Sequence, residues 1–442
     1  MKLSELMSSL SIALDITEGQ PPGHCVRSCW IGMHVGRALK LSDHELWELY
    51  YVLLLKDLGC SSNAARICSL YMTDDLSFKR EFKTVGDSLA AVVGFVVSHT
   101  GLKAGLAERF KATMNIFKNG SEISIELIQT RCQRGSEIAK LLRFSEAVSA
   151  GIYSLDEHFN GMGKPHGISG EQIPVYSQIA LLAQVADVMN RAKNPEGARE
   201  EIAHRSGTWF SPRMAQAFDE AQKTPNFWEV LADEQIVQRL VLSLAPGALE
   251  VKLDEDYLDD IATAFGQIVD SKSPYTSGHS ARVAVFTDLI AVELGLPTER
   301  RRWLKRGALL HDIGKLGVSN SILDKPGKLE DAEWVEMRSH AALTEQILSQ
   351  MENFQELARV AGAHHERLDG KGYPRGIAAD SIELETRIIT VADIFDALTA
   401  DRPYRGPMPV ADALKIMDNM SGTALDPRCL DALKKSLLTH VE

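Results

Sequence analysis

The amino-acid sequence predicts an all-α protein that consists of two tandem helical domains, residues 1–250 and 251–442. Three observations predict this fold. Apolar residues recur at steps of three and four in nearly every long segment, alternating β-branched strands are scarce, and the second half repeats the pattern of the first. The length of 442 residues also suits two or three domains.

The helical periodicity is clear in the segments 279–295 and 384–398. The apolar positions are Val283, Phe286, Leu289, Ile290 and Leu294 in the first segment, and Leu384, Ile388, Val391, Ile394, Phe395 and Leu398 in the second. Side chains at this spacing lie on one face of an α-helix. Each segment therefore predicts a helix that packs against a core.

The boundary between the two predicted domains lies near residues 246–256. Pro246 and Gly247 follow an apolar run and end a helical pattern. The acidic stretch 254–256 then precedes a new helical pattern. Proline and glycine interrupt helices, and acidic residues favour a first helical turn, so this segment is typical of a linker.

The composition restricts the function and the compartment. The net charge of −12 disfavours a DNA or RNA polymer as a partner, although a small anion could bind in a metal-loaded pocket. The six cysteines form no framework of close pairs, which suits a reducing compartment. The sequence has no long apolar run and no signal-peptide pattern, so we expect a cytoplasmic protein without membrane insertion.

The two halves repeat each other at four separated points in the same order. His24 and Asp57 have the same separation as His279 and Asp312. The other aligned segments are 55–60 with 310–315, 160–168 with 369–377, and Val185-Ala186-Asp187 with Val391-Ala392-Asp393. Such an ordered self-match indicates a duplication.

The two copies differ where polar chemistry would be expected. The aligned pairs are His311 and Lys56, Lys315 and Cys60, His364 and Leu155, His365 and Asp156, and His340 near Cys132. A cage that lacks these nitrogen ligands and contains a lysine should not hold a metal pair. The first half is therefore predicted to be the same helical scaffold without its metal site.

The second half collects residues that divalent metals prefer as ligands. They are His279, His311, Asp312, His340, His364, His365 and Asp393. Seven imidazole and carboxylate groups suffice for two metals, and the two oxygens of Asp312 could bridge them. A metal pair clamps a phosphodiester and activates water near neutral pH. Lys315 and Arg402 are candidate contacts to the phosphate.

Each of these residues has a simpler interpretation when it is taken alone. His279 could begin a helix, and Asp393 could be a buried hydrogen-bonding carboxylate. The glycines and proline of the segment 369–374 could form a tight turn, and Lys315 and Arg402 could be solvated charges. Their joint presence in one half, and the loss of several in its twin, favours a metal centre.

The second half resembles the HD-GYP subgroup of the HD-domain phosphohydrolases. The resemblance rests on 311–315, on His364-His365-Glu366, on 369–374 and on 402–404. It implies an all-helical fold, a centre of two or three metals such as iron or manganese, and hydrolysis of bacterial cyclic dinucleotides. Where some members have a glutamate for a third metal, this chain has Tyr275, so two metals are expected.

The resemblance also implies roles for the segment with the Gly-Tyr-Pro sequence. In the family this segment helps to shape the site and contacts partner proteins. The site-shaping residues here would be Asp369, Gly370, Gly372, Tyr373 and Pro374. Contacts with signalling proteins through this segment are therefore expected, and a homodimer stays open.

The tandem arrangement resembles the bacterial enzymes that degrade 3′3′-cyclic GMP-AMP (3′3′-cGAMP). It implies a degenerate HD domain followed by a catalytic HD-GYP domain, with Asp312 and Lys315 at the catalytic centre. The implied product is the linear dinucleotide 5′-pApG. The alternatives are a c-di-GMP phosphodiesterase, a non-catalytic cyclic-dinucleotide receptor and a mononucleotidase.

Overall fold

The computed structural model describes the whole chain except residues 1, 87, 103, 248–250, 402–405 and 440–442. All regular elements in the described residues are helices, apart from two isolated β-bridges. The predicted all-α class is therefore confirmed. None of the described helices is both long enough and apolar enough to cross a membrane.

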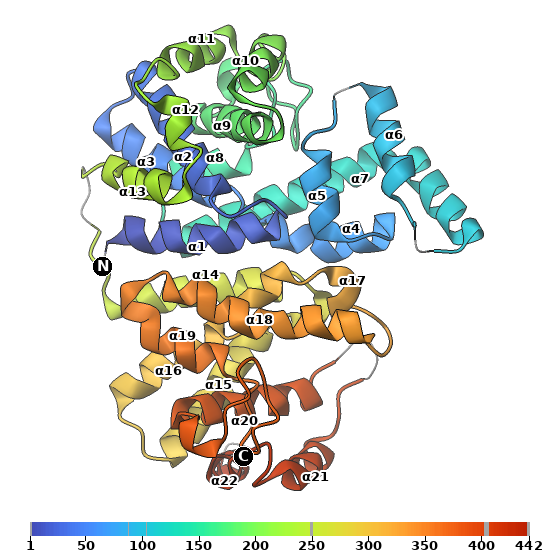
Figure 1. The fold of residues 1–442 in the computed structure, drawn as a ribbon, viewed down its shortest axis with the longest axis vertical. Coiled ribbons are helices and arrows are strands. Elements are labelled where there is room, and N and C mark those ends of the chain that lie inside the picture. Colours follow the sequence, from blue (N-terminus) through green and yellow to red (C-terminus); the bar gives the residue numbers. More distant parts are fainter. Residues whose placement is uncertain (1, 87, 103, 248–250, 402–405, 440–442) are drawn as a thin grey trace. The chain divides into compact units, whose positions relative to one another are not determined.

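The chain divides into two compact units, Met1–Asp254 and Glu255–Glu442. Figure 1 shows the helices of each unit. The predicted linker at 246–256 contains the point of division. Seven seryl, aspartyl or asparaginyl side chains, such as Ser42, Ser145 and Asn194, accept a backbone N–H at the start of an α-helix of the first unit, which satisfies an otherwise unpaired donor.

The first unit is built on helices that pack around α2. Its helices are α1 (Leu3–Thr17), α2 (His24–Ala38), α3 (Asp43–Leu55), α4 (Ala64–Tyr71), α5 (Asp75–Phe82), α6 (Leu89–His99), α7 (Leu106–Leu141), α8 (Glu146–Tyr153), α9 (Val175–Ala192), α10 (Pro195–His204), α11 (Pro212–Ala221), α12 (Phe227–Val230) and α13 (Glu234–Leu244), with the 3₁₀ turns η1 (Cys60–Asn63) and η2 (Gly170–Gln172). Helices α3, α9, α11 and α13 lie against α2, and helices α4 to α6 extend to one side (Figure 1).

The second unit is built on helices that pack around α15. Its helices are α14 (Glu255–Asp270), α15 (His279–Glu293), α16 (Thr298–Leu310), α17 (Asn320–Leu323), α18 (Asp331–Ser349), α19 (Gln355–Gly362), α20 (Leu384–Thr399), α21 (Val410–Met420) and α22 (Pro427–Thr439), with the 3₁₀ turns η3 (Pro274–Thr276), η4 (Ile313–Gly317), η5 (Glu352–Phe354) and η6 (Ala379–Ser381). The predicted helices at 279–295 and 384–398 correspond to α15 and α20.

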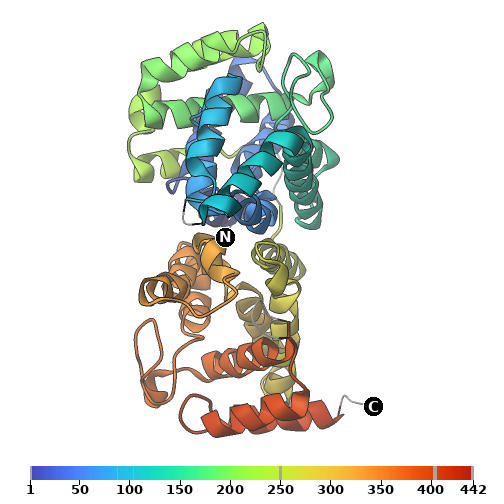
Figure 2. The same cartoon turned by 90° about the vertical axis from the view of Figure 1, so that its right-hand side faces the viewer.

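The apolar faces of α15 and α20 form the core of the second unit. Val283 and Ile290 of α15 and Ile388, Val391 and Phe395 of α20 are fully buried or nearly so. Helices α16 and α22 also lie against α15. Because this core fixes α15 and α20 side by side, it also fixes the polar residues that the two helices carry at their other faces. The loop between α19 and α20 runs along the outside of the unit (Figure 2).

The two units share local structures at corresponding positions. A cis X–Pro bond lies at Lys164–Pro165 in the first unit and at Tyr373–Pro374 in the second. Each is followed by a short 3₁₀ turn, η2 or η6, and then by a long helix, α9 or α20. These features bear on the duplication that the sequence indicates.

Candidate metal centre

Seven polar side chains of the second unit converge from the ends of some helices and from the interiors of others. His279 is the first residue of α15, and its place follows from Gly278, whose φ of 68° starts the helix. His311 and Asp312 directly follow α16, and His340 lies within α18. The remaining three side chains come from the segment after α19, with His364 and His365, and from α20, with Asp393.

One part of the cluster surrounds the Oδ2 atom of Asp312. His279 Nε2 lies 3.4 Å from it and His311 Nε2 lies 3.3 Å from it. Asp393 Oδ1 lies 3.4 Å from His279 Nε2 and 3.8 Å from His311 Nε2. Two imidazoles and two carboxylates therefore face one point.

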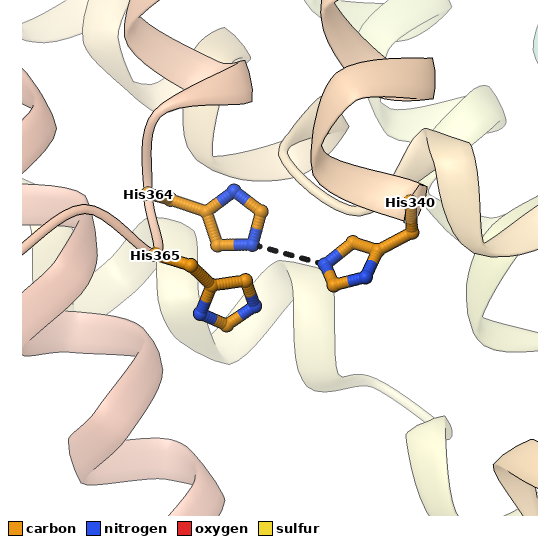
Figure 3. A group of neighbouring side chains, drawn as sticks. All are labelled: His340, His364 and His365. Carbon is orange, nitrogen blue, oxygen red and sulfur yellow. Dashed lines mark hydrogen bonds between the residues drawn. The ribbon is translucent and has the colours of Figure 1, made fainter. Parts of the chain in front are cut away.

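The other part of the cluster surrounds the Oδ1 atom of Asp312. His340 Nε2 lies 3.4 Å from this oxygen, and His364 Nε2 lies 3.6 Å from it. These two nitrogens are 3.4 Å apart, and His365 completes the group (Figure 3). The two oxygens of Asp312 thus face two different groups of histidines.

Hydrogen bonds on the far side of each ring fix how four of the histidines point. The Nδ1 atoms of His311, His340 and His364 donate to the carbonyl oxygens of the residues three positions earlier, at 2.7, 2.5 and 2.6 Å. His279 Nδ1 donates to Asp396 Oδ2 at 2.7 Å. Because Nδ1 holds a proton, the neutral form of each ring has its lone pair on Nε2, which faces the cluster as a metal ligand must.

The cluster contains buried polar atoms that the described residues leave without a hydrogen bond. They include Nε2 of His279, Nε2 of His311 and Oδ1 of Asp312. An unpaired buried polar atom costs about 1–3 kcal/mol. Imidazole and carboxylate donors of this kind are the ligands that divalent transition metals take, so the residues present fit a metal ion.

The charges in the cluster are unbalanced around His279 and His311. Burial opposes protonation of His279, yet hydrogen bonds to Asp312, Asp393 and Asp396 raise its pKa to about 10. Burial likewise opposes protonation of His311, but Asp312 and Asp393 raise its pKa to about 9. Burial lowers the pKa of His340 to about 4 and that of His365 to about 3. The surplus negative charge therefore lies on the side of Asp312 and Asp393.

Two residues that the sequence analysis missed support His279. Asp396 accepts the hydrogen bond of His279 and also bonds to Arg282, with Nε at 2.6 Å and Nη2 at 3.0 Å. Arg282 Nη1 donates to the carbonyl oxygen of Ser277 at 2.8 Å. The signal was available, because an arginine follows the first histidine by three residues in both halves of the sequence.

The segment 369–374 lies beside the cluster and shapes it through Tyr373. The Tyr373 ring lies 4.7 Å from the ring of His365, and its backbone N–H donates to the His365 carbonyl at 3.2 Å. A side chain at Gly372 would approach the backbone N of Arg367 to 2.5 Å, so glycine is required there. Gly370 has a φ of 72°.

Asp369 and Pro374 serve the loop rather than the ligand cluster. The Asp369 carboxylate bonds to Arg367 at 2.8 and 3.0 Å and to the backbone N–H of Lys371 at 3.1 Å. Pro374 follows the cis peptide bond. Glu366, which the sequence analysis quoted as part of the motif without giving it a role, holds the loop by accepting three backbone N–H groups within 375–377.

Lys315, one of the two candidate phosphate contacts, lies next to Asp312. The Lys315 ammonium is hydrogen-bonded to Oδ2 of Asp312 and is partly exposed. It therefore lies at the edge of the cluster, between the carboxylate and solvent. Arg402 lies outside the described residues.

The corresponding region of the first unit corrects two details of the sequence alignment. His24 Nδ1 bonds to Asp187 at 2.7 Å, and Arg27 Nε bonds to the same carboxylate at 2.8 Å. Asp187 therefore corresponds to Asp396, and the alignment with Asp393 was wrong. When the alignment of 160–168 with 369–377 is continued without a gap, it gives this register and places Gln184 opposite Asp393.

The second correction concerns the counterpart of His340. A side chain at Gly59 would approach the Arg131 carbonyl oxygen to 1.9 Å, just as one at Gly314 would approach that of His340 to 2.0 Å. The residue in the place of His340 is therefore Arg131, and Cys132 is its neighbour. The guanidinium of Arg131 pairs with Asp156, the counterpart of His365.

The first unit thus has fixed cations where the second unit has histidines. Lys56, in the place of His311, is buried and paired with Asp57. Burial and the Lys56 ammonium lower the pKa of His24 to about 4, against the hydrogen bond to Asp187. Glu18, Asp57 and Cys60 also lie close enough together to hold a metal. Lys83 lies 2.7 Å from Glu18, however, so lysines already neutralise both carboxylates.

Fold and cluster together define an HD-domain protein. The HD domain family matches residues 263–429, a range that contains all seven side chains of the cluster. Over 435 residues the chain is 59% identical to 3′3′-cGAMP-specific phosphodiesterase 3 of Vibrio cholerae serotype O1, covering 98% of this chain and 94% of that protein. The cyclic di-GMP phosphodiesterase response regulator RpfG of Xanthomonas campestris is 35% identical over 47% of this chain and 56% of its own length.

A solved structure gives the same result. The crystal structure of a cyclic GMP-AMP-specific phosphodiesterase of Vibrio cholerae is similar over 99% of this chain and 97% of that chain, with 52% identity and a TM-score of 0.67. The chain therefore belongs to the HD-domain family of cyclic-dinucleotide phosphodiesterases. The resemblance stated from the sequence is confirmed.

Proposed function

We propose that this chain hydrolyses 3′3′-cGAMP to the linear dinucleotide 5′-pApG. The observation that carries the proposal is the 59% identity to a 3′3′-cGAMP-specific enzyme over 98% of the chain, which includes the first unit as well as the second. The similarity to RpfG, which is named for cyclic di-GMP, extends over only 47% of the chain. This difference favours cGAMP over cyclic di-GMP as the substrate.

Two divalent metals, iron or manganese, fit the donor set of the second unit. His279, His311 and Asp393 would hold one, and His340, His364 and His365 the other. Asp312 would bridge them, because its Oδ2 faces the first group of histidines and its Oδ1 the second. When bound, such a pair polarises a phosphoryl oxygen and lowers the pKa of a coordinated water.

The protein's own residues orient the phosphodiester beside this centre. Lys315 is hydrogen-bonded to Asp312 and partly exposed, so its ammonium can turn to a non-bridging phosphate oxygen and neutralise its charge. Tyr373 lies against His365 and limits how that ring can move. Arg402 is retained as a second phosphate contact on the basis of its residue type and place in the sequence.

The first unit is proposed to be a degenerate HD domain that holds no metal. Its support is the shared hydrogen-bond pattern of His24, Arg27 and Asp187, together with the replacement of two histidines by Lys56 and Arg131. A buried ammonium or guanidinium repels a metal ion from the same space. We place the catalytic domain at 251–442 and the degenerate one at 1–250.

The experiment that tests this function is product analysis with the full-length protein. Manganese- or iron-loaded protein is incubated separately with 3′3′-cGAMP, c-di-GMP and c-di-AMP, and the products are separated by chromatography. We expect 5′-pApG from cGAMP, at a higher rate than any product from the other two. Asp312→Ala, checked for folding by circular dichroism, should give no product.

Other outcomes would contradict specific parts of the proposal. Faster cleavage of c-di-GMP would show that the proposed substrate is wrong and that the proposed reaction, hydrolysis of a cyclic dinucleotide, is right. Binding of cGAMP without cleavage by metal-loaded protein would make the chain a receptor. Contacts with signalling proteins through the segment 369–374, and a homodimer, remain predictions.

A further inference from the structure

A cavity of about 270 Å³ opens to solvent beside the metal cluster of the second unit. It lies between the turn before α15, the first turns of α15, and the end of α20. The residues that line it include Tyr275, Arg282, Phe286, Asp396 and Asp401. None of the seven predicted metal ligands lines it.

The cavity is close to the centre because Asp396 belongs to both. This carboxylate lines the cavity and accepts the hydrogen bond of His279 Nδ1 at 2.7 Å. Only the imidazole of His279 separates the cavity wall from the unpaired Nε2 that faces the cluster. In a nucleotide, one sugar separates the base from the phosphate. The span of one sugar is comparable to the width of this ring, so the cavity lies at the distance that a base would reach from a phosphodiester held at the cluster.

The lining has the chemistry of a base-binding pocket. Phe286 and Tyr275 supply aromatic surface, and such surfaces are where planar bases stack. The polar groups are few, which is typical of pockets for small organic ligands. They are the guanidinium of Arg282 and the carboxylates of Asp396 and Asp401.

The carboxylate of Asp401 is available for a ligand. It makes no hydrogen bond or ion pair with any described residue. The two carboxylate oxygens can accept both the N1–H and the N2–H of a guanine. Adenine offers an acceptor at N1 instead, which repels a carboxylate. Three N–H groups of Arg282 donate hydrogen bonds to Asp396 and Ser277. Its other N–H groups can donate to guanine O6 or N7.

The first unit provides an internal comparison. It keeps the same histidine, arginine and aspartate, but the side chain of Arg27 is 1% exposed, whereas that of Arg282 is 42% exposed. Gln20 stands in the place of Tyr275, and Ala192 in the place of Asp401. The supporting hydrogen bonds are thus common to both units, while the open arginine, the aromatic ring and the free carboxylate occur only beside the metal cluster.

We infer that this cavity binds the guanine base of the dinucleotide, with Asp401 as the residue that distinguishes guanine from adenine. The inference rests on the proposed function for its substrate. It adds which base lies in which place and which side chain selects it.

Direct binding tests this assignment independently of turnover. GMP and AMP share the phosphate and ribose, so a difference in their affinity reports on the base. Isothermal titration of manganese-loaded full-length protein should give at least about 10-fold tighter binding of GMP. Asp401→Ala should remove this preference by weakening GMP and leaving AMP nearly unchanged. Asp412→Ala, which removes an exposed carboxylate of α21, is the matched control and should keep the preference.

A kinetic measurement separates the pocket from the metal centre. The substrate bis(p-nitrophenyl) phosphate has a diester but no base. We expect Asp401→Ala to raise the KM for 3′3′-cGAMP by about 10-fold or more, and to lower kcat/KM for cGAMP relative to that for the base-free diester. Equal affinities for GMP and AMP in the unmodified protein, or an unchanged preference in Asp401→Ala, would overturn the inference. A GMP preference in a protein that cleaves no diester would uphold the pocket and overturn the proposed function.

Discussion

Single residues decide how the proposed metal ligands are held. His279 can present its Nε2 to the cluster only if Nδ1 keeps its proton and the ring stays in place, and Asp396 secures both with one hydrogen bond of 2.7 Å. Arg282 in turn holds Asp396 through two hydrogen bonds. Partners of this kind orient the ring and raise the basicity of a histidine ligand.

The first prediction concerns Asp396. Asp396→Asn keeps the shape of the side chain but removes the charge that attracts the His279 N–H and the Arg282 guanidinium. The apparent affinity for manganese should fall by about 10–100-fold, the usual cost of losing such a partner. Titration of the metal-free protein with manganese, followed by electron paramagnetic resonance, measures it.

The matched variant lies in the first unit. Asp187→Asn removes the corresponding charge beside His24. If the first unit holds no metal, this change should leave manganese affinity and stoichiometry unaltered. Equal losses of metal affinity in the two variants would argue against the assignment of a metal centre to the second unit alone.

The second prediction concerns the buried pair of Lys56 and Asp57. Lys56→Met removes the ammonium and leaves a buried carboxylate without its nearest cation. The first unit should lose about 3–5 kcal/mol of unfolding free energy, as other broken buried ion pairs do. Urea denaturation, followed by the fluorescence of the tryptophans, measures the loss.

A double variant shows whether the charge is the cause. In Lys56→Met/Asp57→Asn both charges are absent, so most of the lost stability should return. A Lys56→Met protein as stable as the unmodified one would contradict the view that fixed cations hold this region together.

The side chains of the site are positioned by helices and by the loop between α19 and α20. That loop is fixed by Glu366, whose carboxylate accepts three backbone N–H groups of its far end. Its close turn brings Gly372 against the backbone at 366–367 and sets Tyr373 against His365. The segment thus contacts His365, one of the proposed metal ligands, although it supplies none of them itself.

The third prediction tests this turn. In Gly372→Ala the new methyl group would lie 2.5 Å from the Arg367 nitrogen, so the loop must move and carry Tyr373 away from His365. We expect a loss of about 1–3 kcal/mol in stability and a larger relative loss in diesterase rate. Thermal unfolding and steady-state kinetics measure the two effects. Gly327→Ala, at a position with open space, is the control and should change neither.

In the whole molecule, the two units neutralise their buried carboxylates in different ways. In the first unit, Lys56 and Arg131 neutralise the buried carboxylates permanently. In the second, Asp312 and Asp393 lie among histidines with a surplus of negative charge. A metal that binds only the folded state stabilises it, so the second unit should depend on metal and the first should not.

The fourth prediction concerns removal of the metal. After dialysis against a chelator, amide hydrogen exchange should become faster in α15 and in the second half of α20, which carries Asp393 and Asp396, and should stay the same in α2 and α9. Mass spectrometry of peptides resolves these helices. Return of manganese should restore protection in the second unit. Equal deprotection of α2 and α9 would contradict the assignment of a metal-free first unit.

The residues of the candidate site could be selected from the sequence because the two matching halves can be compared with each other. The seven metal-type residues could be recognised since several of them are replaced in an otherwise similar half. The sequence analysis aligned α9 with α20 in the wrong register. Asp187 was paired with Asp393 because each follows a Val-Ala pair, but its partner in space is Asp396. Three residues are nearly one helical turn, so both aspartates of α20 face the same way, and only the hydrogen bonds distinguish them.

The sequence by itself determined the helical class, the repeat and the residue types that can bind a metal. These properties follow from local periodicity and from chemistry that each side chain carries with it. The tertiary structure decided that the two oxygens of Asp312 face different histidines, that Arg131 replaces His340, and that Arg282 is exposed while Arg27 is buried. These facts depend on how distant helices pack, since the groups that meet are separated by tens of residues and their contacts follow from no local pattern.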